Sequence, residues 1–157
     1  MSENTLRDAI QSSMIAAMRA KEKDKLGVIR LIQAAIKQEE INARAQETEQ
    51  APLSDQQVLE LLAKMIKQRR ESIQQYTAAN REDLATKERF EIDVIQTFLP
   101  TPLTADELKQ LIQEAMQASG AASIRDMGKV MALLKPKIQG RADPSEVAAQ
   151  IKAQLNT

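Results

Sequence analysis

The 157-residue chain is long enough for one domain or two small ones, and its 22 basic and 22 acidic residues give a formal net charge of zero. It contains no cysteine and no histidine, which excludes disulfides and zinc sites built from these ligands and removes the commonest general base. No apolar run approaches the roughly 20 residues that span a membrane, and the first ten residues lack the apolar core of a secretory signal, so we expect a cytoplasmic protein without a membrane partner.

Apolar residues recur at helical spacing along the chain, and almost none is aromatic. Residues 5–21 and 26–44 are expected to form the first two helices, and the polar, proline-containing stretch 45–55 a loop. Ser54 is expected to cap a third helix, and after a break near residues 78–83 a fourth helix runs to about residue 98. The pattern predicts an all-α fold that begins with a bundle unit of about four helices over residues 1–99.

A boundary is expected near "LPTPLTADE", because its two prolines disfavour helix in the residues before them. Thr104 and Glu107 then form a capping box that starts a new helix, which Gly120 ends. The next helix is expected to open at Ser123. Asp143 is expected to cap the last one, whose first residue is a proline. Residues 100–157 are therefore predicted to form a three-helix unit.

Catalytic motifs are absent from the sequence. Neither "GxxxxGK[ST]" nor "GxGxxG" occurs, and Ser12 and Ser13 have no base nearby in the sequence and no glycine-rich loop for an oxyanion hole. Glu88 and Glu91, three residues apart, share a helix face, but a solvated surface is the favoured interpretation. We predict no catalytic site, no metal site and no cofactor.

Two groups of basic residues are candidates for binding. Lys64, Lys67 and Arg70 recur at intervals of three and form a secondary basic face, for which a solvated helix surface is the favoured interpretation. The second group lies in "IRDMGKVMALLKPKIQGRAD", residues 124–143. A helical wheel of this stretch puts an apolar core stripe on one side, made of Met127, Val130, Met131, Leu134 and Ile138. The opposite side carries Arg125, Gly128, Lys129, Ala132, Pro136 and Gln139, flanked by Lys135.

This outward side combines small residues with long cationic ones. Small residues let a partner approach the backbone, Pro136 leaves the carbonyl of Ala132 without a donor, and lysine suits phosphate contact. The alternative is structural: Gly128 packs against a helix, Gly140 caps one, and the charges near the helix end complement its dipole. The residues alone favour neither interpretation.

Three blocks of the sequence, residues 13–40, 65–76 and 124–151, resemble the GatB/YqeY family. They read "SMIAAMRAKEKDKLGVIRLIQAAIKQEE", "MIKQRRESIQQY" and "IRDMGKVMALLKPKIQGRADPSEVAAQI". The resemblance implies a helical protein similar to the tail domain of the B subunit of tRNA-dependent amidotransferase, where the tail helps to hold tRNA. The matching positions imply an RNA-contacting face, and Lys135 joins it from the helical wheel. The matching residues are Gly128, Lys129, Pro136, Lys137, Gly140, Arg141 and Asp143.

Three hypotheses for function follow. The first is a tRNA-binding module without a catalytic site of its own. The second is an accessory protein that docks on an amidotransferase or an aminoacyl-tRNA synthetase without contacting RNA. The third is the family's carbon–nitrogen ligase activity with glutamine as amido donor. We expect no such activity from this chain alone, because the sequence ends at Thr157 without the catalytic domains of the amidotransferase and lacks histidine, cysteine and a phosphate loop.

Overall fold

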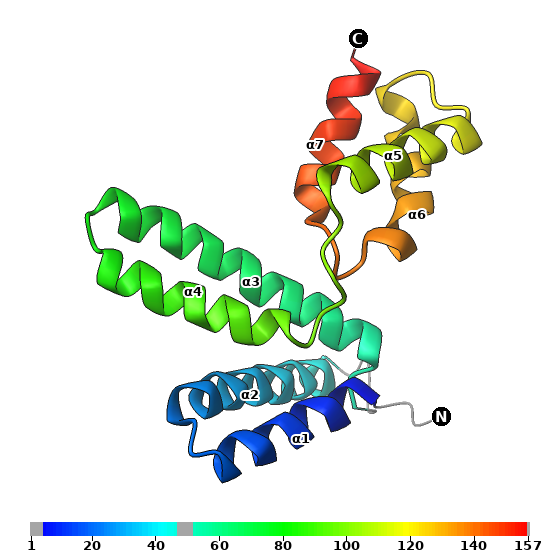
Figure 1. The fold of residues 1–157 in the computed structure, drawn as a ribbon. Coiled ribbons are helices and arrows are strands. Elements are labelled where there is room, and N and C mark those ends of the chain that lie inside the picture. The colour runs from blue at the N-terminus through cyan, green and yellow to red at the C-terminus, as the bar shows by residue number, and fades with distance from the viewer. Residues whose placement is uncertain (1–4, 47–51, 157) are drawn as a thin grey trace. The chain divides into compact units, whose positions relative to one another are not determined.

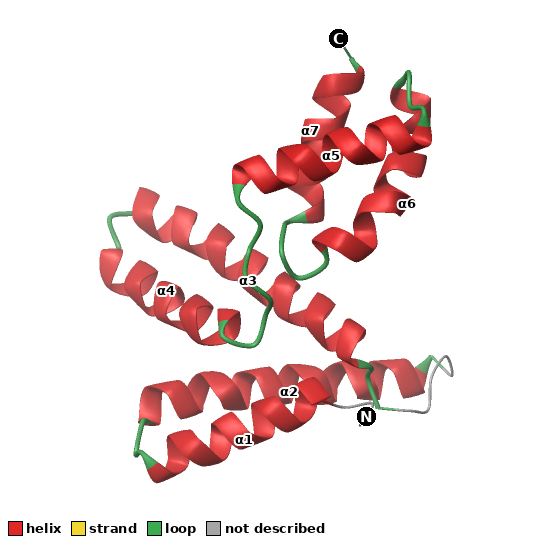
Figure 2. Cartoon of the chain, turned by 45° about the vertical axis from the view of Figure 1, so that its right-hand side comes forward, coloured by secondary structure: helices red, strands yellow, loops and turns green. Residues whose placement is uncertain are grey.

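The computed structural model describes residues 5–46 and 52–156, and every regular element in these ranges is helical (Figures 1 and 2). The all-α prediction is therefore confirmed. The chain divides into two compact units, Met1–Leu99 and Pro100–Thr157. Of the predicted loop over 45–55, residues 47–51 lie outside the described residues, and residues 52–54 are not helical.

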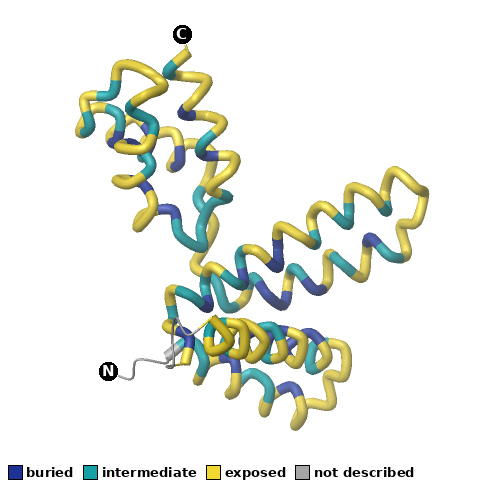
Figure 3. Tube along the Cα trace, turned by 180° about the vertical axis from the view of Figure 1, so that it is seen from behind, coloured by how far each residue is buried: buried dark blue, intermediate teal, exposed yellow. Residues whose placement is uncertain are grey.

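The first unit consists of two helical hairpins (Figure 1). Helix α1 (Thr5–Arg19) lies beside α2 (Lys23–Ala45), and α3 (Asp55–Ala78) lies beside α4 (Glu82–Gln96). Their buried positions face one another and their exposed positions face outward (Figure 3). The core is aliphatic, as the composition predicts, and each fully buried leucine or isoleucine contributes about 1.5–3 kcal/mol. Its fully buried large side chains include Ile10, Ile29, Ile32, Leu62 and Ile95.

Helix ends in the first unit follow local chemistry. Ser54 caps α3 as predicted, and its side chain accepts a hydrogen bond from the Gln57 amide. The first helix ends at Arg19 rather than at residue 21, because Lys21 takes a left-handed conformation with φ of 60°. Asn80 takes the same conformation between α3 and α4, with φ of 59°. Asparagine tolerates this region much better than lysine does.

The second unit packs α5 (Ala105–Ser119), α6 (Met127–Ile138) and α7 (Pro144–Leu155) around one aliphatic core. The predicted capping box of Thr104 and Glu107 is present, and Gly120 ends α5 with φ of 65°. Asp143 caps α7 as predicted, accepting a hydrogen bond from the Ser145 amide at 2.9 Å. The fully buried members of this core are Ile112, Val130, Leu134, Ile138, Val147 and Ile151.

The helix expected from Ser123 onward is split. A short 3-10 turn, η1 (Ile124–Asp126), precedes α6. The Asp126 carboxylate accepts hydrogen bonds from the amides of Ala122 at 2.9 Å and Ser123 at 3.3 Å, which closes the chain into a tight turn. The same two bonds lower the pKa of Asp126. Arg125 therefore belongs to this turn. The helical positions predicted for this stretch hold only from Met127 onward.

Candidate functional site

The outward surface of α6 is the candidate site in the second unit. Val130, Leu134 and Ile138 are buried as the wheel predicted. The twelve residues of α6 include three lysines and no acid, and all three lysines are exposed. The helix is thus a basic element in a chain whose net charge is zero.

The three lysines do not converge on one point. Lys135 and Lys137 are two residues apart, which places them about 160° apart around the helix, on opposite flanks of its exposed side. Viewed down the helix axis, Lys129 lies between Lys135 and Lys137. Along the axis it lies near the opposite end of α6 from these two lysines. The arrangement is a basic surface that extends along the helix rather than a compact anion pocket.

Lys129 is the member of this set that the fold explains least. Lys135 and Lys137 lie in the last turn of α6, where a cation is favoured by the helix dipole. Lys129 lies in the first turn, where the same dipole disfavours it. Its side chain is 71% exposed, and its Nζ lies 3.9 Å from the Asp126 carboxylate, a surface pair that contributes little.

Gly128 has no packing role within the described residues. A Cβ atom added to it would meet nothing within 4 Å, so the interpretation that this glycine allows close helix packing is wrong here. Its neighbours on the exposed side of α6 include Ala132 and Pro136, and Leu133 is 43% exposed. The surface around Lys129 is therefore partly apolar and has low relief.

Gly140 and Arg141 both have structural roles. Gln139 with φ of −59° and ψ of 123°, followed by Gly140 with φ of 71°, forms a type II turn. This turn is closed by a 2.8 Å bond from the Arg141 amide to the Ile138 carbonyl. The Arg141 Nε donates to the Thr101 carbonyl at 2.8 Å. This contact joins residues 40 positions apart, so no local sequence pattern indicates it.

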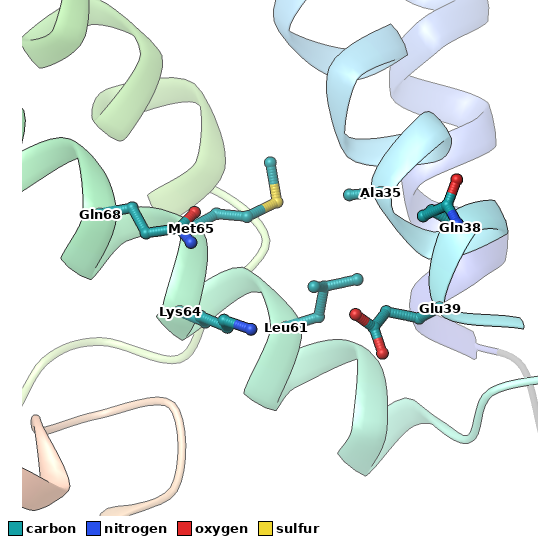
Figure 4. Close-up of a pocket in the computed structure, with 7 residues that line it drawn as sticks. All are labelled: Ala35, Gln38, Glu39, Leu61, Lys64, Met65 and Gln68. Carbon is teal, nitrogen blue, oxygen red and sulfur yellow. The ribbon is translucent and has the colours of Figure 1, made fainter. Parts of the chain in front are cut away.

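The secondary basic face lies on α3, where Lys64, Lys67 and Arg70 are exposed. Lys64 also lines a groove of about 190 Å³ between α2 and α3 (Figure 4). Aliphatic side chains of Ala35, Leu61 and Met65 line it together with polar groups that include Glu39. The groove is too small for a nucleotide, and its lining offers one cation.

An ion pair between α3 and α4 was also missed. Arg69 and Glu91 approach to 3.4 Å with side chains only 15% and 11% exposed, although the Arg69 Nε is not aligned for a hydrogen bond. The interpretation of Glu91 as solvated surface is therefore wrong. Burial, followed by the charge of Glu91, raises the pKa of the neighbouring Glu88.

Two other kinds of site are absent from the described part of the chain. Within residues 5–46 and 52–156, no group of three or more acidic side chains is placed to hold a metal ion. No helix in these same ranges combines the length and the hydropathy of a membrane span.

Comparison with known proteins gives one family and a set of curated relatives. The family model described as "Yqey-like protein" matches residues 7–155. "Altered inheritance of mitochondria protein 41, mitochondrial" of Pyrenophora tritici-repentis is 34% identical over 151 residues, covering 94% of this chain and 79% of the relative. The protein of that name from Lachancea thermotolerans is 28% identical over 154 residues, covering 94% and 80%. That of Saccharomyces cerevisiae is 31% identical over 99 residues, covering 63% and 51%.

These comparisons contradict the cytoplasmic expectation, because the relatives are named as mitochondrial proteins. The expectation rested on the lack of an apolar signal or membrane segment. Mitochondrial targeting segments are amphipathic, rich in arginine and poor in acids, so a search for apolar runs says nothing about them.

Proposed function

The chain belongs to the YqeY-like family, and from this premise we propose that its C-terminal unit binds the phosphate backbone of tRNA through the exposed side of α6. The observation that carries the proposal is the charge of this helix. It has three exposed lysines and no acid within a protein of zero net charge. Local basic surfaces of this kind attract nucleic acid even when the whole protein is neutral.

The chemistry of the unit favours contact with phosphates over contact with bases. Residues 100–157 contain no aromatic side chain, so bases have no platform on which to stack. The lysines are long and flexible, and open space at Gly128 lets a sugar–phosphate strand approach the backbone. Recognition by the outer shape of a folded RNA is expected, with weak dependence on its sequence.

The test is tRNA binding across a salt series with the full chain. The variant Lys129→Gln/Lys135→Gln/Lys137→Gln removes the basic surface, and Lys109→Gln/Lys152→Gln removes exposed lysines from the other two helices of the unit. Each phosphate contact contributes roughly 0.7–0.9 to the slope of log affinity against log salt. For the α6 variant, the slope of log affinity against log salt is expected to become shallower by about two, and for the control variant by much less. Equal losses in both variants, or no binding at low salt, would refute the proposal.

Arg141 is left unchanged in this design because its contact with Thr101 belongs to the fold. A variant at this position would mix loss of binding with loss of structure. The same reasoning applies to Gly140, whose positive φ the turn requires.

A second candidate is docking on a protein, such as an amidotransferase or an aminoacyl-tRNA synthetase, without RNA. One observation favours it: Leu133 is 43% exposed on the same side of α6 as Lys129. The variants Leu133→Gln and Lys129→Gln separate the two functions. Binding to RNA depends on Lys129 and is insensitive to Leu133, whereas docking on an apolar protein surface depends on Leu133.

A further inference from the structure

Helix α2 carries a row of basic residues at a strict interval of seven. The row consists of Lys23, Arg30, Lys37 and Arg44, all of them exposed. Within residues 5–46 and 52–156, none of the four has an acidic partner at ion-pair distance. Seven residues correspond to about 10.5 Å along a helix, so the row follows α2 for nearly its whole length.

A second row of exposed residues runs beside the basic one. Its members are separated alternately by four and three residues, and all but one are apolar or small. They are Gly27, Leu31, Ala34, Gln38, Ile41 and Ala45. Leu31 is 47% exposed and Ile41 is 48% exposed. This stripe lies on the side of α2 opposite Ile29, Ile32 and Ile36, which fill the core of the unit.

Gly27 is a poor choice for this position on grounds of folding alone. It lies within a 23-residue helix, and a Cβ atom there would meet nothing within 4 Å. Glycine is the weakest helix former apart from proline, and here no neighbour within the described chain requires it. A glycine and two alanines on one exposed stripe would instead allow a second helix to approach the α2 backbone closely.

We propose that this side of α2 is a docking surface for an amphipathic helix of a partner protein. The partner presents an apolar stripe to Leu31 and Ile41 and a row of acidic residues to the basic row. An alternation of four and three residues is the seam of a coiled-coil contact, and charged rows beside such a seam select the partner. The four cations without acidic partners therefore specify an acidic helix.

Two other occupants fit less well. An RNA strand would satisfy the cations but would gain nothing from two half-exposed aliphatic side chains. A second copy of this chain, packed antiparallel along the same stripe, would set the two basic rows against each other. An acidic amphipathic helix satisfies both rows at once.

The experiment uses a defined probe with the full chain. The probe is a fluorescent synthetic helix of three heptads, with leucine at the seam positions and glutamate along one flank. Binding is followed by fluorescence anisotropy at low and high salt. A matched peptide with glutamine in place of glutamate tests the charge requirement. The glutamate peptide is expected to bind more tightly, and the difference is expected to shrink as salt rises.

Two pairs of variants locate the site. Arg30→Gln/Lys37→Gln removes half of the basic row, and Lys109→Gln/Lys152→Gln removes two exposed cations from the second unit. The first is expected to weaken binding by about tenfold, because exposed charges contribute up to a few-fold each, and the second to leave it unchanged. Leu31→Gln/Ile41→Gln is matched by Ile15→Gln/Met18→Gln, whose apolar side chains are exposed on α1.

Three results would overturn the proposal. The first is failure of the glutamate peptide to bind at high concentration, or equal binding of both peptides. The second is sedimentation of the parent chain as a dimer that Leu31→Gln/Ile41→Gln dissociates, since the stripe would then hold a second copy. The third is loss of tRNA binding in Arg30→Gln/Lys37→Gln with unchanged peptide binding, which would assign the row to RNA. The first two results concern α2 alone, and the third leaves the expected effect of the α6 variant on tRNA binding to be measured independently, so this proposal and the proposed function fail separately.

Discussion

Replacement of Gly27 by alanine should stabilise the first unit. In a helix interior, alanine is favoured over glycine by about 0.8–1.0 kcal/mol. Gly27 is the fifth residue of a 23-residue helix, and the open space around it removes any cost of overpacking. We therefore expect a gain of about 0.8 kcal/mol in the free energy of unfolding, or roughly 4–6 °C in the melting temperature of a unit of this size.

Two other glycines serve as matched controls. Gly128→Ala should also stabilise, but by less, because Gly128 is only the second residue of α6. Gly120→Ala should destabilise by about 1 kcal/mol, because Gly120 ends α5 with φ of 65°. Urea unfolding followed by far-ultraviolet circular dichroism measures all three. A neutral or destabilising Gly27→Ala would refute the reasoning, since it would mean that other atoms cover Gly27 in solution.

Three further predictions concern charged groups. Arg69→Met leaves the buried Glu91 carboxylate without its cation, so the free energy of unfolding should fall by about 2–4 kcal/mol; an unchanged urea midpoint, or an equal loss in Arg69→Met/Glu91→Gln, would contradict this explanation. The pKa of Glu88 is raised, so the folded state binds this proton more tightly than the unfolded state does. The free energy of unfolding therefore falls as the pH rises from the unfolded-state pKa of this group through its folded-state pKa. Glu88→Gln should therefore be more stable than the parent at neutral pH and equal to it below about pH 4, as urea midpoints would show. Arg141→Gln removes the bond to the Thr101 carbonyl and should lower the stability of the second unit by about 1–2 kcal/mol; an unchanged urea midpoint would count against that contact.

The helices and three of their starts could be predicted because their signals are local, whereas α2 begins at Lys23 rather than at the expected residue 26. Ser54, Thr104 and Asp143 each cap a helix within three residues of the group they bind. The core stripes of α2 and α6 followed from periodicity for the same reason. The 3-10 turn before α6 was missed because its cause, the bonding of Asp126 to two preceding amides, also resembles an ordinary capping box.

The long-range contacts could not be predicted in this way. Arg69 and Glu91 look like two members of solvated helix faces until α3 and α4 are packed, and only then do they share a buried space. The same holds for Arg7 and Glu40, which pair across α1 and α2. At the candidate site, the sequence identified the basic character of α6, but it did not separate the lysines from Arg141, whose partner lies 40 residues away.

The turn between α6 and α7 has a consequence for how this family is recognised. Within the "GRAD" block, Gly140 supplies the left-handed turn residue, Arg141 holds the chain that leads into α5, and Asp143 starts α7. Each letter of the block except alanine thus encodes a joint between helices. In this chain these letters therefore report the architecture of the second unit, whereas the basic surface is formed by the solvent-facing lysines of α6 that precede them.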